Sequence, residues 1–223
     1  MTRKITVFIQ RLLFFWDRPV GDNYRGENAE EYLSRRASQP HWRLEHESLA
    51  EILHGLPDGG RVLDVPFGTG RFVNLYLEKN MAVFGLDASP DMLQIAKIQL
   101  KEDFSKCDLR IGDATRLPYP SEYFDIVISV RFLSHVLSYS KAKRTIKELA
   151  RVARKYAILQ FRVRHDSCPP VRSPLPWEPM NDRLYLRDIE TILDKSGLAV
   201  DEVKPLDQRP TYYRAFFVCT KIF

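Results

Sequence analysis

The stretch VLDVPFGTGR, residues 62–71, decides the fold. It begins with apolar residues typical of a buried strand, and Gly68 and Gly70 then open a helical stretch. In open α/β sheets, ligands bind beyond the carboxyl ends of parallel strands, where such a turn meets a helix N-terminus. Asp64 lies at that end of the strand, and the glycines allow a ligand to approach the backbone closely. The stretch therefore predicts a ligand-binding turn in a parallel sheet.

Outward from this turn, predicted strands alternate with predicted helices. Strands are expected over 61–65, 81–87, 107–113, 124–130, 156–163, 199–206 and 212–223, and helices over 70–80, 89–102, 141–155 and 184–197. Ser89 is the expected N-cap of its helix, with Pro90 at the first helical position. The alternation predicts βαβ units in a Rossmann-like, doubly wound α/β sheet that is mostly parallel.

The region 164–182 interrupts the alternation. It contains CPPVRSPLPWEP, whose five prolines exclude a helix or a central strand. Long loops in compact domains are often lids or binding loops. We expect this loop to border an acceptor site and to be mobile without ligand.

Residues 1–56 are expected to form an N-terminal helical cap, and residues 57–223 the main domain. Apolar residues at helical spacing form one stripe in the first part: Ile5, Phe8, Ile9, Leu12, Leu13 and Trp16. Gln10 and Arg11 interrupt the stripe, which argues against a secretory signal. Basic residues flank it, so residues 3–18 either dock on the domain or a partner, the more frequent role of such a stripe, or contact a membrane interface peripherally.

The charge is concentrated in one segment. The chain of 223 residues has a net charge of +5, yet residues 141–172 alone hold ten Lys or Arg against two acids. A solvated helix face explains this segment, and attraction of an anionic partner is the alternative. Three cysteines without metal-ligand spacing indicate reduced thiols in the cytoplasm and no metal site.

Acidic residues end the first three predicted strands: Asp64, Asp87 and Asp113. Asp87 follows Gly70 by 17 residues, a placement that suits hydrogen bonds to both hydroxyls of a ribose. One such residue could simply cap a turn, but three on one rim point to a ligand site. A nicotinamide dehydrogenase uses the same rim, but its G-x-G-x-x-G pattern fails because Val73 stands at the third glycine.

Four stretches together resemble class I S-adenosylmethionine-dependent methyltransferases, in particular the subgroup of ubiquinone- and menaquinone-type enzymes. They are VLDVPFGTGR, FGLDASPDML, IGDATRLPYPSEYFDIVIS and KELARVARKYAILQ. The resemblance covers residues 62–161 and, more weakly, the chain to residue 223. It implies a seven-stranded sheet with an antiparallel last strand, methyl transfer as the activity and S-adenosyl-L-methionine as the cofactor.

The resemblance also implies roles for single residues. The methionine end of the cofactor would be surrounded by Asp64, Pro66, Phe67, Gly68, Thr69 and Gly70. The ribose and adenine would be contacted by Asp87, Ala88, Met92, Asp113 and Ala114, and contacts after the fourth strand would come from Val130 and Arg131. Pro66 and Phe67 depart from the family's pattern, in which a glycine and a small residue are usual, and Phe67 would crowd or wall the pocket.

The acceptor is less constrained. In-line transfer from a sulfonium needs no acid, and needs a base only if the nucleophile must lose a proton. His135 and His165 are the candidate bases, with a structural role as the alternative for each, and Arg131 could recognise an acidic acceptor. Candidates for closing over the site from the N-terminal region are Tyr24, Tyr32, Arg36 and Trp42.

The sequence favours transfer to an oxygen or nitrogen of a small-molecule or lipid-linked acceptor. The alternatives are an RNA or protein methyltransferase that uses residues 141–172, and a non-catalytic cofactor-binding scaffold. Nucleic acid is disfavoured because the chain shows no RNA-binding module. The acceptor, its reacting atom and the oligomeric state are not set by the sequence.

Overall fold

The computed structural model describes residues 39–134 and 137–222. The elements in chain order are α3 (Pro40–His54), β1 (Arg61–Asp64), α4 (Val73–Glu78), β2 (Ala82–Asp87), α5 (Pro90–Leu100), the 3₁₀ helix η2 (Lys101–Lys106), β3 (Cys107–Ile111), β4 (Phe124–Ser129), α6 (Tyr139–Val152), β5 (Ala153–Arg164), α7 (Leu186–Asp194), β6 (Leu198–Gln208) and β7 (Tyr212–Lys221).

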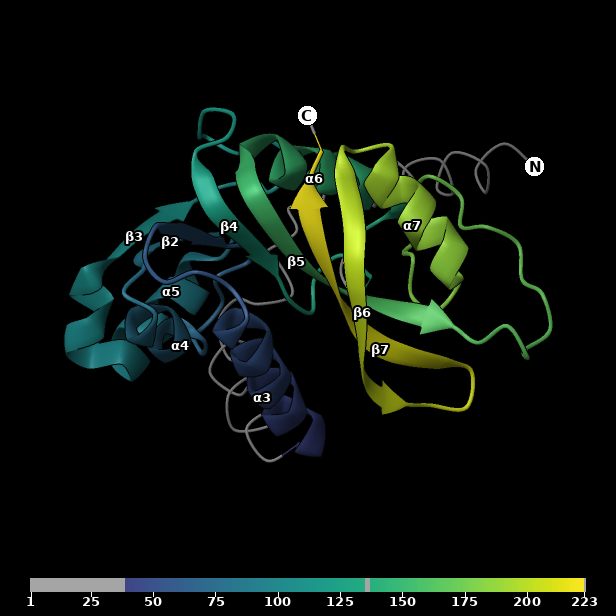
Figure 1. The fold of residues 1–223 in the computed structure, drawn as a ribbon, viewed down its shortest axis with the longest axis horizontal. Coiled ribbons are helices and arrows are strands. Elements are labelled where there is room, and N and C mark those ends of the chain that lie inside the picture. The colour runs from purple at the N-terminus through teal and green to yellow at the C-terminus, as the bar shows by residue number, and fades with distance from the viewer. Residues whose placement is uncertain (1–38, 135–136, 223) are drawn as a thin grey trace, which may run out of the picture.

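Seven strands form one sheet in the order β3-β2-β1-β4-β5-β7-β6 (Figure 1). The pairs from β3 to β5 are parallel, and β7 runs antiparallel to both β5 and β6. The predicted doubly wound sheet is therefore confirmed, with its antiparallel last strand inserted next to the edge. The reversal of strand order at β1 and β4 places their carboxyl ends side by side, which is where open α/β sheets form ligand crevices.

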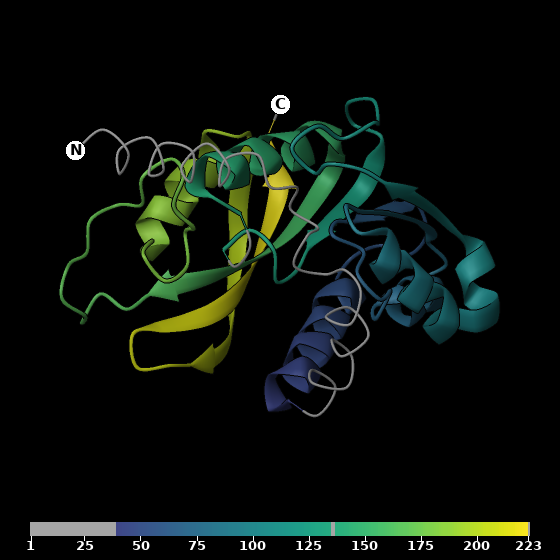
Figure 2. The same cartoon turned by 180° about the vertical axis from the view of Figure 1, so that it is seen from behind.

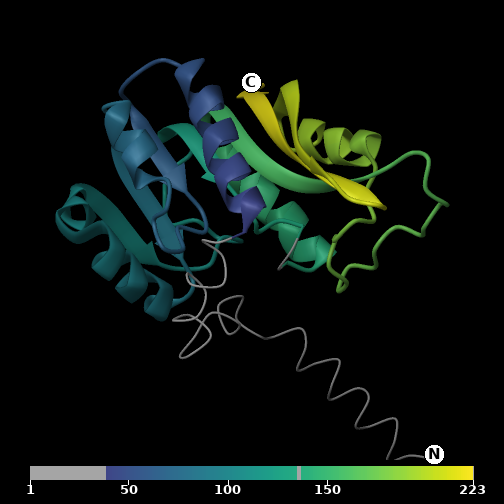
Figure 3. The ribbon, with the colours of Figure 1, turned by 90° about the horizontal axis from the view of Figure 1, so that it is seen from below.

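Helices cover both faces of the sheet (Figures 1 and 2). On one face α6 and α7 bury apolar residues against alternate positions of β5 and β7. On the other face α3, α4 and α5 do the same against the intervening positions. Figure 3 shows α3 lying against this face of the sheet, where Lys204 of β6 forms an ion pair with Glu51 of α3. The central strands β1 and β4 are buried on both faces because both faces are covered, whereas the edge strands β3 and β6 carry exposed positions.

The helix predicted over 141–155 ends three residues early. α6 stops at Val152, and Ala153 is already extended and pairs with Phe124 of β4. Arg154 and Lys155 both lie beside Asp125 of β4. The prediction for residues 153–155 was wrong because strand pairing outweighs their local helical preference. The connection between α6 and β5 has no linker residues.

Other boundaries follow their predicted chemistry. The Ser89 hydroxyl accepts a hydrogen bond from the Met92 N–H, which confirms the N-cap of α5. Gly197 has φ +83, the left-handed conformation that ends a helix. The region 165–182 contains no helix or long strand.

Of the predicted N-terminal cap, α3 is described, and its Leu49, Ile52 and Leu53 pack into the same core as the sheet. The apolar stripe within residues 3–18 lies outside the described residues. Among the helices that the structure describes, none is long and apolar enough to cross a bilayer.

Candidate functional site

A cleft opens at the carboxyl ends of β1 to β4 and holds about 290 Å³ of space. Of the thirteen residues predicted for a cofactor, those that line it are Asp64, Pro66, Phe67, Gly68, Thr69, Asp87, Ala88, Met92, Asp113, Ala114, Val130 and Arg131. The thirteenth, Gly70, does not line it. Trp42 of α3 also lines the cleft, as do Arg71, Phe72 and Phe132, which the sequence analysis did not name.

Asp64 lies at the floor of the cleft and is 2% exposed. The Tyr76 hydroxyl donates a hydrogen bond to its Oδ2 over 2.9 Å. Burial raises the pKa of Asp64 to about 8, although the Tyr76 hydrogen bond and the nearby Arg71 oppose the rise. Asp64 is therefore a proton-holding group that a cationic ligand would ionise.

Asp87 organises the turn after β1. Its Oδ2 accepts the Gly68 N–H over 2.8 Å, and its Oδ1 accepts the Ser89 N–H over 2.9 Å. Burial raises its pKa, and these backbone hydrogen bonds oppose the rise. Gly68 has φ +58, so the turn requires a residue that tolerates the left-handed region. The carboxylate thus holds two loops, β1–α4 and β2–α5, at the cleft.

Phe67 is larger than the small residue expected at this position, and Gly85 of β2 leaves space for its ring. A Cβ atom on Gly85 would lie 2.2 Å from the Phe67 ring, so the ring occupies the space that a side chain there would need. A Cβ on Gly70 would also press on Phe67, at 3.0 Å, and on Leu100, at 2.7 Å. Gly70 therefore serves close packing between the turn and α5, and Phe67 forms a wall of the cleft.

The adenine-side candidates from the second and third strands also meet at the cleft. Met92 is 3% exposed, and its Cε lies 3.7 Å from where a Gly68 side chain would begin. Asp113 accepts the Thr115 N–H over 2.8 Å, forming a local turn at the end of β3. An apolar wall with a carboxylate at its edge suits a planar, amine-bearing ring.

A buried carboxylate, Glu45 of α3, gathers three arginines beside the cleft. Its Oε2 accepts a hydrogen bond from Arg71 over 2.6 Å and lies 3.6 Å from Nη1 of Arg131, and its Oε1 lies 3.4 Å from Nη1 of Arg214. Gln160 of β5 donates to Oε1 over 3.0 Å. We call these five residues the Glu45 cluster.

The Glu45 cluster fixes the side of the cleft nearest α3. The guanidinium of Arg71 stacks on the Trp42 ring at 4.0 Å from its centroid. Sequence analysis missed Glu45 as a functional candidate. The signal was its position on the apolar face of α3, four residues before Leu49 and seven before Ile52.

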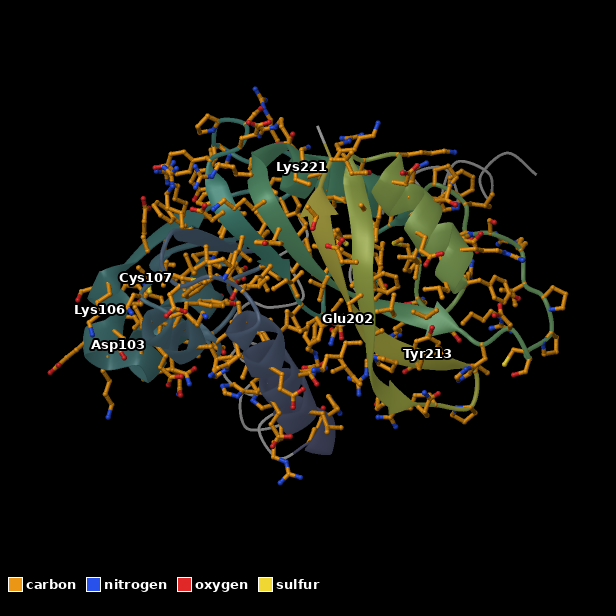
Figure 4. The ribbon with its side chains drawn as sticks, viewed as in Figure 1. Asp103, Lys106, Cys107, Glu202, Tyr213 and Lys221 are labelled. Carbon is orange, nitrogen blue, oxygen red and sulfur yellow. The ribbon has the colours of Figure 1, made fainter. Side chains whose placement is uncertain are left out.

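The structure does not bring His165 to the cleft. Its Nε2 lies 2.9 Å from the Arg209 carbonyl in the β6–β7 turn, and its ring lies 5.5 Å from that of Tyr213. Figure 4 shows Tyr213 on the β7 side of the molecule, far across the sheet from Cys107 of β3. His135 lies outside the described residues, as do Tyr24, Tyr32 and Arg36. No group of three or more His, Cys, Asp or Glu within the described ranges could hold a metal ion.

Residues 63–161 match a family described as a methyltransferase domain. Phosphatidylethanolamine N-methyltransferase of Cereibacter sphaeroides is 39% identical over 99 residues, which cover 44% of this chain and 47% of that protein. Demethylmenaquinone methyltransferase of Tropheryma whipplei (strain Twist) is 36% identical over 96 residues, or 43% of this chain and 38% of that protein.

A third relative is tRNA (carboxymethyluridine(34)-5-O)-methyltransferase of Arabidopsis thaliana, 30% identical over 106 residues, or 48% of this chain and 24% of that protein. This chain thus spans less than half the length of these curated relatives. A crystal structure of magnesium protoporphyrin IX methyltransferase from Synechocystis PCC 6803 superposes with a TM-score of 0.69 and 18% identity, covering 91% of this chain and 97% of the other. That similarity shows a shared fold.

Proposed function

We propose that the cleft binds S-adenosyl-L-methionine and that the protein transfers the methyl group to an acceptor, since residues 63–161 match a methyltransferase domain. The observation that carries the proposal is the meeting of Asp64, Asp87 and Asp113 in one cleft with an apolar wall. Three carboxylates without a metal-type grouping suit a ligand rich in hydroxyl and amine donors.

The residues of the cleft divide the binding task. The Asp87 carboxylate, already fixed by two backbone N–H groups, keeps lone pairs for ribose hydroxyls. Asp113 and Ala114 contact the adenine edge, while Met92 and Ala88 pack against the ring. Asp64, Pro66, Phe67, Gly68 and Thr69 surround the methionine portion; Gly70 supports that turn by packing, and Val130 and Arg131 complete the wall.

When bound, the cofactor supplies an activated methyl: an acceptor lone pair bonds to the methyl carbon as the carbon–sulfur pair returns to sulfur. The protein's task is then to align the acceptor in line with that bond and to exclude water. Trp42 and Phe132 shield the cleft from the α3 and β4 sides. A proton released by an O–H or N–H acceptor passes to water or to His135; His165 is too remote from the cleft to serve.

We propose an oxygen or nitrogen of a small-molecule or lipid-linked compound as the acceptor. The proposal is supported by the curated relatives, whose names include a phosphatidylethanolamine and a demethylmenaquinone methyltransferase. Residues 3–18 would then meet the membrane interface through their apolar stripe. Binding of the full chain to anionic vesicles at low salt, lost on deleting residues 1–18, tests that contact.

An RNA acceptor is the second candidate, favoured by the tRNA-methyltransferase relative and by Lys143, Arg144 and Lys147, which are exposed along α6. RNA binding through that face would weaken steeply with salt. Incubating the full chain with methyl-labelled cofactor and matched lipid, metabolite and RNA fractions decides between the two. Label in an organic fraction supports the first proposal, label in RNA the second, and label in neither contradicts transfer activity.

A further inference from the structure

The face of β5 that looks toward α3 changes character along the strand. Ile158 is fully buried in the α3 layer, Gln160 hydrogen-bonds Glu45, and Arg162 comes next on the same face. From residue 158 to residue 162, this face of β5 therefore changes from apolar to polar and then to cationic toward the carboxyl end of the strand. That end adjoins the cleft, because Arg131 at the end of β4 lines it.

Arg162 faces a second arginine directly. Its register partner on antiparallel β7 is Arg214, and like charges opposite one another weaken a sheet. Asp207 of β6 pairs with Arg214 on its other side, over 2.8 Å from Nε. Burial lowers the pKa of Arg162; Tyr212 and Asp182 oppose this, and the nearby Arg214 and Arg131 add to it. The register of β5 and β7 therefore places two positive charges side by side, which is unfavourable for the stability of the sheet.

Arg131, at the end of β4, has an uncommon backbone conformation and contacts Gln160 and Glu45. Its φ of +58 is uncommon for a residue with a side chain, and such strain persists where neighbours enforce it. The Arg131 N–H donates to Oε1 of Gln160 over 2.9 Å, and Glu45 faces its guanidinium. Its Nη1 is buried without a hydrogen-bond partner among the described residues. Nη1 lies 3.6 Å from Oε2 of Glu45, which is an ion-pair distance but too long for a hydrogen bond, so this donor keeps hydrogen-bonding capacity for a ligand.

The field around these arginines is positive. Among the described residues, ion pairs join Arg71, Arg131, Arg164, Arg209 and Arg214 to the carboxylates of Glu45, Asp182 and Asp207. Arg162 lies near Asp182, and Arg71 also lies near Asp64, so six arginines share four carboxylates there. Burial is the main reason that the pKa of His41 of α3 is lowered to about 4; Arg214 and Arg131 lower it further, and Glu45 and Asp207 oppose them. By contrast, the β1–β3 side of the cleft carries carboxylates.

We propose that Arg131 and Arg162 bind an oxyanion, a carboxylate or phosphate, on the methyl acceptor, next to the cofactor site. Arg214, Gln160 and Glu45 are positioning residues for this pair. The inference rests on the proposed function and narrows its acceptor to anionic compounds. Guanidinium groups suit planar and tetrahedral oxyanions because they donate two parallel hydrogen bonds.

The test uses the full chain saturated with S-adenosylhomocysteine, and calorimetric titration at constant ionic strength. The probes are acetate, glycerol 3-phosphate and phosphatidylcholine vesicles with or without phosphatidic acid. We expect at least one anionic probe to bind, and Arg162→Gln to weaken it about 10-fold while Arg162→Lys keeps part of the affinity. Binding of soluble probes alone points to a free metabolite, and binding of phosphatidic acid vesicles alone to a lipid head group.

Arg187→Gln, on the exposed face of α7, is the matched control and should leave every affinity unchanged. S-adenosylhomocysteine should bind Arg162→Gln within twofold of the unmodified chain. Equal anion affinity in Arg162→Gln and the unmodified chain, no anion binding, or binding only when S-adenosylhomocysteine is absent would overturn the inference. If the unmodified chain does not bind S-adenosylhomocysteine at all, the proposed function is contradicted. If that chain still binds an anion and Arg162→Gln loses this binding, the anion site itself is supported.

Discussion

The hydroxyl of Tyr76 and the carboxyl of Asp64 form a buried hydrogen-bonded pair, with 2.9 Å between their oxygens, beneath the floor of the cleft. Tyr76 comes from α4 and Asp64 from the end of β1, so the pair ties the first βα unit together at the cleft. Burial opposes charge on both groups: the pKa of Asp64 rises to about 8, and that of Tyr76 rises well above its usual value.

This pair predicts a pH dependence of stability. Between about pH 4 and pH 8 the folded chain keeps the Asp64 proton that the unfolded chain has released, so this stabilising contribution is lost as pH rises. Relative to Asp64→Asn, the free energy of unfolding of the unmodified, ligand-free chain should fall by up to about 1.4 kcal/mol per pH unit. Urea unfolding at pH 5 and pH 7.5 measures it. Exposed Asp108→Asn is the control, and parallel pH profiles for Asp64→Asn and the unmodified chain would refute the expectation.

The Glu45 cluster predicts a contrast between two glutamates of α3. Glu45→Gln removes the carboxylate from three partly or fully buried arginines, which should lower the free energy of unfolding by about 3–5 kcal/mol. Within the described part of the chain, Glu47 forms its ion pair with exposed Arg43, so Glu47→Gln should change the free energy of unfolding by less than about 0.5 kcal/mol. Denaturant unfolding of both variants measures the two changes. Equal changes would show that the Glu45 cluster stabilises the fold no more than an exposed ion pair does.

Phe67 and Gly85 should be energetically coupled. Gly85→Ala places a methyl 2.2 Å from the Phe67 ring and 2.7 Å from Leu109, so overpacking should cost about 1–3 kcal/mol. In Phe67→Ala the same change should cost less, because the ring is gone. A double-mutant cycle measures the coupling, with Gly55→Ala, whose new methyl meets nothing nearer than 3.4 Å, as control. Strict additivity would contradict the packing argument.

Glu178 should protect the proline-rich loop from cleavage. Its carboxylate accepts two hydrogen bonds from Arg172, at 2.7 and 2.6 Å, and one from Arg183. Trypsin must extract the Arg172 side chain to cut after it, so Glu178→Gln should speed that cut several-fold, whereas Glu190→Gln on α7 should not. Mass spectrometry of the fragments identifies the site. S-adenosylhomocysteine with an anionic probe should slow the cut if the loop borders the acceptor site, and equal rates would speak against that placement.

Local sequence patterns predicted the part of the candidate site that is formed by the ends of the first three strands. The β1 turn, the Ser89 cap and the three carboxylates each depend on a few consecutive residues, so periodicity and capping chemistry located them. The predicted end of α6 was wrong because Ala153 pairs with Phe124 of β4, about thirty residues earlier. Local helical preference does not predict such a long-range strand pairing.

The partners of Glu45 could not be predicted from the sequence, for the same reason. Glu45 meets Gln160 and Arg214 across 115 and 169 residues, and chain order gives no hint of those contacts. Only the sheet order, with β7 inserted between β5 and β6, brings Arg214 beside Arg162. Single charged residues on apolar faces, such as Glu45 on α3, are the positions that sequence reasoning should have flagged.

The central claim is that the cleft holds the cofactor through Asp87. Calorimetric titration of the full chain with S-adenosyl-L-methionine should show one site, and Asp87→Ala should weaken it about 100-fold while circular dichroism shows a folded protein. Asp108→Ala, an exposed acid on β3 outside the cleft, should bind like the unmodified chain. Unchanged affinity in Asp87→Ala, or no binding by the unmodified chain, would contradict the account.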